Sequence, residues 1–70
     1  MNKEQILNKI SENIRIERLK KRYSQEKLSD MADITQKYLN YIENKKANPS
    51  IVVVVKICNA LEITLNDLLK

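Results

Sequence analysis

Glycine, histidine, tryptophan and phenylalanine are missing from this chain of 70 residues, and proline and cysteine occur once each. Without glycine, and with Pro49 as its only proline, the sequence contains nothing typical of a linker, a hairpin turn or a low-complexity tract. A single cysteine excludes an intramolecular disulfide, and the lack of histidine removes the usual zinc ligands and the commonest general base. We therefore expect an all-helical fold with no metal site and no cofactor.

The same absences disfavour several functional classes. The sequence has no phosphate-binding loop and no nucleophile paired with a base, so an enzyme is not expected. No apolar run approaches the roughly 18 residues of a membrane span, and residues 1–9 lack the apolar core of a signal peptide. The sequence predicts one cytoplasmic domain over residues 1–70, with no membrane partner and no small-molecule ligand. At this size we expect a marginally stable monomer or a dimer.

The net charge of +4 is unevenly placed. Residues 1–46 hold eleven of the thirteen Lys and Arg and seven of the nine Asp and Glu, whereas residues 47–70 hold two of each kind. A basic part joined to a neutral, apolar part indicates that one end meets a polyanion and the other meets protein. On charge alone, a solvated lysine-rich surface is the simpler explanation.

Apolar spacing near 3.6 residues predicts a long amphipathic helix over residues 3–21. Its apolar face is predicted to contain Ile6, Ile10, Ile14 and Leu19.

Two short helices should follow, joined by a turn of about three residues. Ser24 can cap the first of them, which should end near Asp33, a residue that tolerates the left-handed conformation. Thr35 can cap the second, which should end near Asn44, another residue that tolerates a positive φ. The pair, at about residues 24–44, can place its second helix so that one face projects from the domain.

Four consecutive valines, residues 52–55, favour a strand by propensity alone. However, Asn48-Pro49-Ser50 breaks the chain and supplies a serine cap, and the following apolar residues recur at helical spacing. The predicted core positions of this segment are Ile51, Val54, Cys58 and Leu61. Each valine costs a helix a few tenths of a kcal/mol, and burying one returns roughly 1.5 kcal/mol, so we predict a helix over 51–61. A last short helix is predicted from Thr64.

The outer face of the helix after Thr35 is polar, whereas Leu39 and Ile42 face inward. The candidates for reading DNA bases on this face are Gln36, Lys37, Asn40 and Tyr41. Gln and Asn can pair with N6 and N7 of adenine, Lys can donate to guanine, and Tyr can contact a thymine methyl group. Any amphipathic helix has a polar face, so these residues do not establish a function by themselves.

The segment SQEKLSDMADITQKYLNYIENKKANPS resembles the helix-turn-helix of the phage repressor and Cro family, also called the Xre family. The resemblance rests on SQEKLS (24–29), IENKKANPS (42–50) and Arg18, and it extends from about Ile14 to Leu69. It implies a five-helix, lambda-repressor-like DNA-binding domain. Three departures are Ser29 for the usual alanine, Asp33 for the glycine of the turn, and Asn44 for the common glycine after the glutamate.

The resemblance also implies roles for individual residues. Residues expected to contact DNA phosphates are Gln25, Thr35, Asn44, Lys45 and Lys46. Helix N-termini suit such contacts because their backbone N–H groups are free. Arg18 and Glu43 lie where family members form a partly buried ion pair, for which a structural role is expected.

Other residues are open to two interpretations. A basic group of four residues, Arg15, Lys20, Lys21 and Arg22, could touch phosphate, but complementing the helix dipole is the favoured role. Cys58 is expected to be a small buried apolar residue rather than a reactive thiol.

Three valines, Val52, Val53 and Val55, lie off the predicted core stripe. The resemblance implies pairing through the C-terminal helices, as in repressors of that family, so these valines are expected to form a dimer interface. We therefore expect a homodimeric, sequence-specific transcription regulator on a palindromic site of double-stranded DNA, with dimerisation helices at about residues 50–69. A restriction-modification controller, a small phage repressor and an antitoxin all fit. The alternative is a protein-interaction module, such as an antitoxin or adaptor, whose apolar C-terminal helices bind a different protein.

Overall fold

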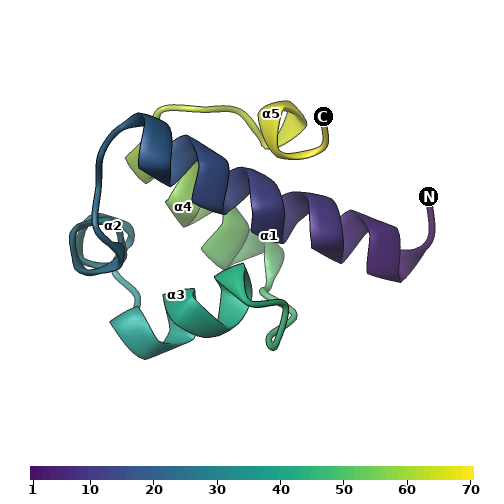
Figure 1. The fold of residues 1–70 in the computed structure, drawn as a ribbon, viewed down its shortest axis with the longest axis horizontal. Coiled ribbons are helices and arrows are strands. Elements are labelled where there is room, and N and C mark those ends of the chain that lie inside the picture. Colours follow the sequence, from purple (N-terminus) through teal and green to yellow (C-terminus); the bar gives the residue numbers. More distant parts are fainter.

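The computed structural model describes residues 1–70 and contains five α-helices and no strand, which confirms the predicted all-helical fold. The helices are α1 (Lys3–Lys20), α2 (Gln25–Ala32), α3 (Gln36–Glu43), α4 (Ile51–Leu61) and α5 (Leu65–Leu68). In Figure 1, α3 lies on the side of the molecule opposite α5, with α1 and α4 between them. None of the helices is both long enough and apolar enough to cross a membrane.

Helix α1 begins with a capping box in which Asn2 and Gln5 exchange backbone-to-side-chain hydrogen bonds of 2.8 and 3.0 Å. Its predicted apolar face is partly wrong. Ile14 is fully buried, but Leu19 is 53% exposed, and Arg18 is buried in its place. At about 100° per residue, Leu19 lies about 140° around the helix from Ile14, whereas Arg18 lies only about 40° away. The spacing of apolar residues could not predict that Arg18 is buried, because an arginine is charged and is not counted among them.

The valine segment is helical, with the predicted bounds of 51–61. The hydroxyl of Ser50 caps α4 by accepting from the backbone N–H of Val53 at 3.2 Å. The predicted core membership needs correction, because Ile51 is 60% exposed. Ile51 lies in the first turn, beyond the edge of the core, and the fully buried Ile57 completes the inner stripe instead.

The three valines predicted to be exposed behave differently. Val52 is 61% exposed and Val55 is 43% exposed. Val53, however, is half-buried and packs against the core. The exposed apolar surface of α4 therefore consists of Ile51, Val52 and Val55, which we call the α4 apolar patch.

Four residues adopt a left-handed conformation, and none of them is a glycine. They are Arg22, Asp33, Lys45 and Glu62, with φ of 60, 56, 63 and 58°. Each follows one of the first four helices, and the next N–H along the chain donates back to a carbonyl of the last helical turn, as in Ile34 N to Ser29 O at 3.0 Å.

Asp33 is left-handed at the end of α2, as predicted, and α3 ends at Glu43 with Asn44 as its C-cap, which agrees with the predicted end near Asn44. Asn44 has a φ of −95°, and the left-handed residue after α3 is Lys45. The left-handed turn after α3 is thus formed at Lys45, one residue beyond Asn44.

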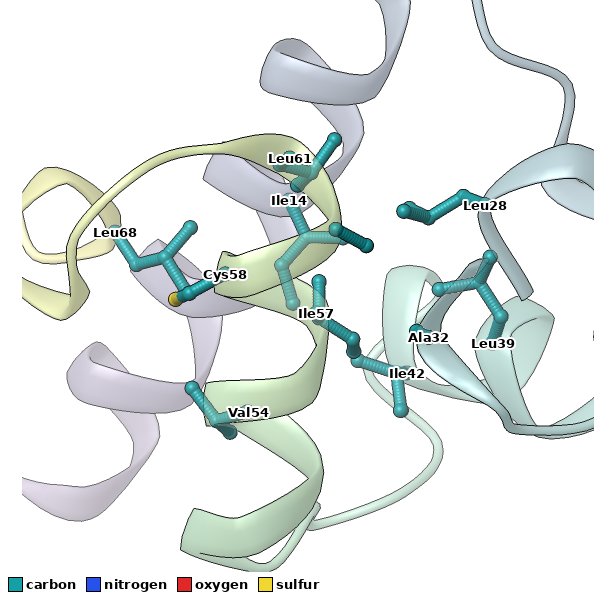
Figure 2. Packing of buried hydrophobic residues seen from close by; sticks show 11 residues of the cluster. Ile14, Leu28, Ala32, Leu39, Ile42, Val54, Ile57, Cys58, Leu61 and Leu68 are labelled. Atoms are coloured by element: carbon teal, nitrogen blue, oxygen red, sulfur yellow. The ribbon is translucent and has the colours of Figure 1, made fainter. Parts of the chain in front are cut away.

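The core is a cluster of eleven buried residues that joins all five helices. Its members are Ile14, Leu28, Ala32, Leu39, Ile42, Val54, Ile57, Cys58, Ala60, Leu61 and Leu68. Figure 2 shows Ile57 and Leu61 of α4 beside Ile14 of α1, with the α2 and α3 residues on one side and Leu68 on the other. Helix α4 packs mainly against α2, whereas α3 is held by its contacts with α2 and α1.

Cys58 is a buried member of this cluster, as predicted. Burial, followed by the nearby charge of Asp67, raises the pKa of its thiol. A protonated, buried thiol behaves as a small apolar side chain rather than as a nucleophile.

Candidate nucleic-acid interface

Helix α3 is held by buried residues on one side and presents its polar residues on the other. Leu39 and Ile42 are fully buried, and the hydroxyl of Thr35 caps the helix by accepting from Tyr38 N at 3.1 Å. The four candidates for base reading are all exposed on the same helix, and they are Gln36, Lys37, Asn40 and Tyr41. The structure therefore brings together the side chains that the sequence singled out for this face.

Two of these side chains contact each other. The ammonium group of Lys37 lies 5.8 Å from the centre of the Tyr41 ring, one helical turn away. At this distance the cation is attracted to the face of the ring. At an exposed site such a contact contributes about 0.5 to 1 kcal/mol, so it weakly favours this arrangement of the two side chains.

The candidates for phosphate contacts occupy both ends of this face. Asn44, Lys45 and Lys46 follow α3 and are all exposed. The side-chain amide of Asn44 donates to the carbonyl oxygen of Asn40 at 2.9 Å, and Lys45 Nζ lies 3.0 Å from Glu12 Oε1. The Lys45–Glu12 pair is solvent-exposed, so its net contribution is small, about 0 to 1 kcal/mol, and the lysine can exchange partners at little cost.

An ion pair lies directly beneath the polar face. Arg18 Nε and Nη2 donate to the two carboxylate oxygens of Glu43 at 2.8 and 2.9 Å, and Nη1 donates to Tyr23 O at 2.9 Å. Both side chains are buried. The guanidinium thus ties the end of α1 to the last residue of α3 and to the chain between α1 and α2.

Gln25, at the start of α2, is predicted from the sequence to contact a phosphate, and its side-chain amide forms hydrogen bonds within the protein. It is half-buried, and its Nε2 donates to Glu43 Oε1 at 3.2 Å. Its Oε1 accepts from Asn40 Nδ2 at 3.3 Å. Sequence reasoning missed these two hydrogen bonds, because no local pattern relates residues 15 to 18 positions apart.

An open groove of about 570 Å³ lies between α1 and the end of α3. It is lined by Glu12, Arg15, Ile16, Leu19, Glu43, Asn44 and Lys45. Arg15 therefore stands beside two of the phosphate candidates rather than in the last turn of α1, where a helix-dipole role would place it.

The three residues predicted for a dimer interface lie on α4, and two of them, Val52 and Val55, belong to the α4 apolar patch. The patch begins two residues after Pro49 and thus follows directly on the segment that leaves α3.

Comparison with known proteins identifies the fold independently. A helix-turn-helix family model matches residues 14–68. Among curated proteins, no match is found. Among solved structures, the restriction-modification controller protein C.AhdI from Aeromonas hydrophila is similar, with 31% identity and a TM-score of 0.85 over 89% of this chain and 94% of that one.

Two further solved structures are similar to this chain. A point mutant of the restriction-modification controller protein C.Esp1396I has 29% identity and a TM-score of 0.82 over 84% of this chain and 77% of that one. The clp gene regulator ClgR from Corynebacterium glutamicum, at 20% identity and a TM-score of 0.87 over 91% of this chain and 68% of that one, shares the fold. With a family model that covers most of its length, the chain belongs to the Xre-like helix-turn-helix family and is a DNA-binding transcription regulator.

Proposed function

We propose that this regulator binds a palindromic operator as a homodimer, with one α3 from each subunit in the major groove. The observation that carries the proposal is the exposed polar face of α3, which rests on two fully buried residues, Leu39 and Ile42, and on the buried pair of Arg18 and Glu43. A rigidly held helix with Gln, Lys, Asn and Tyr on its outer face has the side-chain chemistry for major-groove readout.

The proposed division of roles follows the position of each side chain. Gln36, Lys37, Asn40 and Tyr41 read base edges. The N-terminal ends of α2, at Gln25, and of α3, at Thr35, approach phosphates, and Asn44, Lys45 and Lys46 approach phosphates beyond the end of α3. Contacts of the first kind discriminate between sequences, whereas contacts of the second kind position the protein on any duplex.

Dimerisation is supported by the α4 apolar patch. Ile51, Val52 and Val55 are all largely exposed, and they lie within one and a half turns of the same helix. Two copies joined about a two-fold axis at this patch would bury it, and the proposal requires their α3 helices to reach successive turns of DNA, roughly 34 Å apart. The similarity to two restriction-modification controller proteins favours a controller of that kind over a phage repressor or an antitoxin.

A second candidate function uses the same patch. If Ile51, Val52 and Val55 bind a different protein, the chain is an antitoxin or an adaptor, and DNA binding is one of two activities. Sedimentation distinguishes the two candidates, because a homodimer buries the patch and leaves no apolar surface of α4 for another partner.

Selection of bound duplexes from a random DNA pool tests the leading proposal. We expect a recovered motif with two inverted half-sites whose centres are about one helical turn apart. A motif without inverted symmetry would contradict the dimeric arrangement, and the recovery of no motif would contradict sequence-specific binding.

A further inference from the structure

Four polar side chains form one hydrogen-bonded series from the interior to the exposed face of α3. Arg18 donates to both carboxylate oxygens of Glu43 at 2.8 and 2.9 Å. Glu43 Oε1 also accepts from Gln25 Nε2 at 3.2 Å. Gln25 Oε1 in turn accepts from Asn40 Nδ2 at 3.3 Å. The series thus links α1, α2 and α3, and it ends on a side chain to which we assign a role in base reading.

In this series, the hydrogen-bonding capacity of each side chain determines how the amide of the next one is oriented. The carboxylate of Glu43, paired with Arg18 through both of its oxygens, can only accept hydrogen bonds. Gln25 must therefore turn its amide nitrogen toward Glu43. An amide that were turned over would face its oxygen to the carboxylate, with two acceptors in contact.

Because Gln25 Nε2 donates to Glu43, the Oε1 atom of Gln25 faces Asn40. That oxygen needs a donor, so Asn40 must offer Nδ2 rather than Oδ1. The second N–H of Asn40 and its carbonyl oxygen are then left on the exposed side of α3. One donor and one acceptor in this arrangement match N7 and N6–H of adenine in the major groove.

We propose that Gln25 is a positioning residue for sequence recognition, which holds the amide of Asn40 in the orientation that pairs with adenine. The inference rests on the proposed readout by α3 and assigns to the Gln25 side chain a role other than gripping phosphate. Its carboxamide is half-buried and is engaged at both ends. Only the free backbone N–H groups at the start of α2 remain for a phosphate.

Gln25→Met is the discriminating variant, because methionine has a similar length and no hydrogen-bonding amide. Selection from a random DNA pool is carried out with the wild type, Gln25→Met and Asn40→Ala. We expect the two variants to lose preference at the same A·T position of the motif, by about tenfold relative to wild type, which is within the discrimination of one bidentate base contact. Gln25→Met should lose less affinity for random-sequence duplex than for the cognate motif, and its salt dependence should change less than that of Lys46→Ala.

Lys46→Ala is the matched control for a phosphate contact. It should weaken cognate and random duplexes alike and reduce the salt dependence by about one counterion. If Gln25→Met behaves in this way, Gln25 is a phosphate anchor and the proposal is wrong. An unchanged motif for Gln25→Met also overturns it. Gln25→Ala serves as a second variant should methionine impair folding.

A measurement without DNA separates the inference from the proposed function. In nitrogen-15 NMR spectra, Gln25→Met should shift the side-chain amide signals of Asn40 and leave those of the exposed Asn48 in place. Unshifted Asn40 signals overturn the inference even if the protein binds a specific operator. If the wild type selects no sequence at all, the proposed function fails, and shifted Asn40 signals would then show a hydrogen bond with no role in recognition.

Discussion

Arg18 is the residue at which the fold and the DNA-binding surface meet, since its guanidinium bonds Glu43 beneath α3 and the carbonyl of Tyr23. We expect Arg18→Met to lower the free energy of unfolding by about 3 to 5 kcal/mol, because it leaves the buried Glu43 carboxylate without its counter-charge. Urea denaturation followed by circular dichroism measures this loss. The control is Lys45→Ala, which breaks an exposed pair and should cost less than about 1 kcal/mol. Equal losses for the two variants would contradict a structural role for Arg18.

Glu62 follows α4 and has a left-handed φ of 58°. Substitutions at this position measure the energetic cost of the left-handed conformation. Glycine adopts this conformation freely, whereas any side chain with a Cβ atom is strained by about 1 kcal/mol or more. Glu62→Gly should therefore exceed Glu62→Ala in stability by about 1 kcal/mol, or about 4 to 8 °C in Tm for a domain of this size. Both variants lose the same charge, so their difference isolates the backbone. A less stable glycine variant would show that chain entropy outweighs the strain.

At single residues, prediction from the sequence succeeded where the physical cause was local. The left-handed Asp33 follows from a short polar residue at a helix end. The hydrogen bonds of Gln25 could not be predicted, because they join residues of different helices whose proximity exists only in the folded chain. The burial of Arg18 was predicted through family resemblance and not through spacing.

Substitutions on α3 and just after it should distinguish residues that read bases from residues that contact phosphates. Gln36→Ala and Tyr41→Ala should each weaken cognate binding by roughly 1 to 3 kcal/mol and relax sequence preference. Lys46→Ala should weaken all sequences alike and flatten the salt dependence. Fluorescence anisotropy with cognate and random duplexes at several salt concentrations measures both effects. Equal losses on the two duplexes for all three variants would contradict the assignment.

Helix α5 has only four residues and depends on its capping box. The backbone N–H of Thr64 donates to Asp67 at 2.9 Å, and this bond, followed by the Lys70 and Thr64 side chains, lowers the pKa of Asp67 below its ordinary 3.8. The stabilisation is therefore present above pH 3.8 and is lost as the pH falls through the lower value of the folded chain. Asp67→Asn should melt below wild type at about pH 6, and the difference in Tm should narrow toward about pH 3. A constant difference would exclude ionisation of Asp67 as its cause.

At the level of elements, the pattern of apolar residues predicted all five helices, including α4 against the strand propensity of its valines. Burial outweighs propensity there, because Val54 and Ile57 are almost fully enclosed. What spacing could not predict is where the core ends. Ile51 lies on the inner side of α4 by angle, but it is the first residue of the helix and is 60% exposed.

At the scale of the whole molecule, the proposed homodimer rests on the exposure of the α4 apolar patch in the single chain. Val52→Lys and Val55→Lys should shift the proposed dimer toward monomer, because each places a charge in the α4 apolar patch. Analytical ultracentrifugation over a range of concentrations measures the shift. Ile16→Lys, at a comparably exposed apolar position on α1, is the control and should leave the sedimentation unchanged. The reverse outcome would place the interface on α1.

Val53 is a poor choice for this test, although the sequence suggested it. It packs against the core, so a lysine there would destabilise the fold itself and confuse dissociation with unfolding.

The overall arrangement of the chain was predictable because a family pattern extends over nearly all of it. The α4 apolar patch was predicted only in part, because outer and inner positions along a helix depend on which neighbours reach each turn.

The four left-handed turns without glycine also make the molecule a starting point for engineering. Natural proteins rarely reach their stability optimum, and a glycine at a left-handed position removes the strain that a Cβ atom causes there. Arg22 and Glu62 lie outside the proposed DNA contacts, so a heat-tolerant version could be built at these two turns while the recognition helix stays as it is. Such a scaffold would accept otherwise destabilising changes on α3 and thereby permit a wider search for altered operator preference.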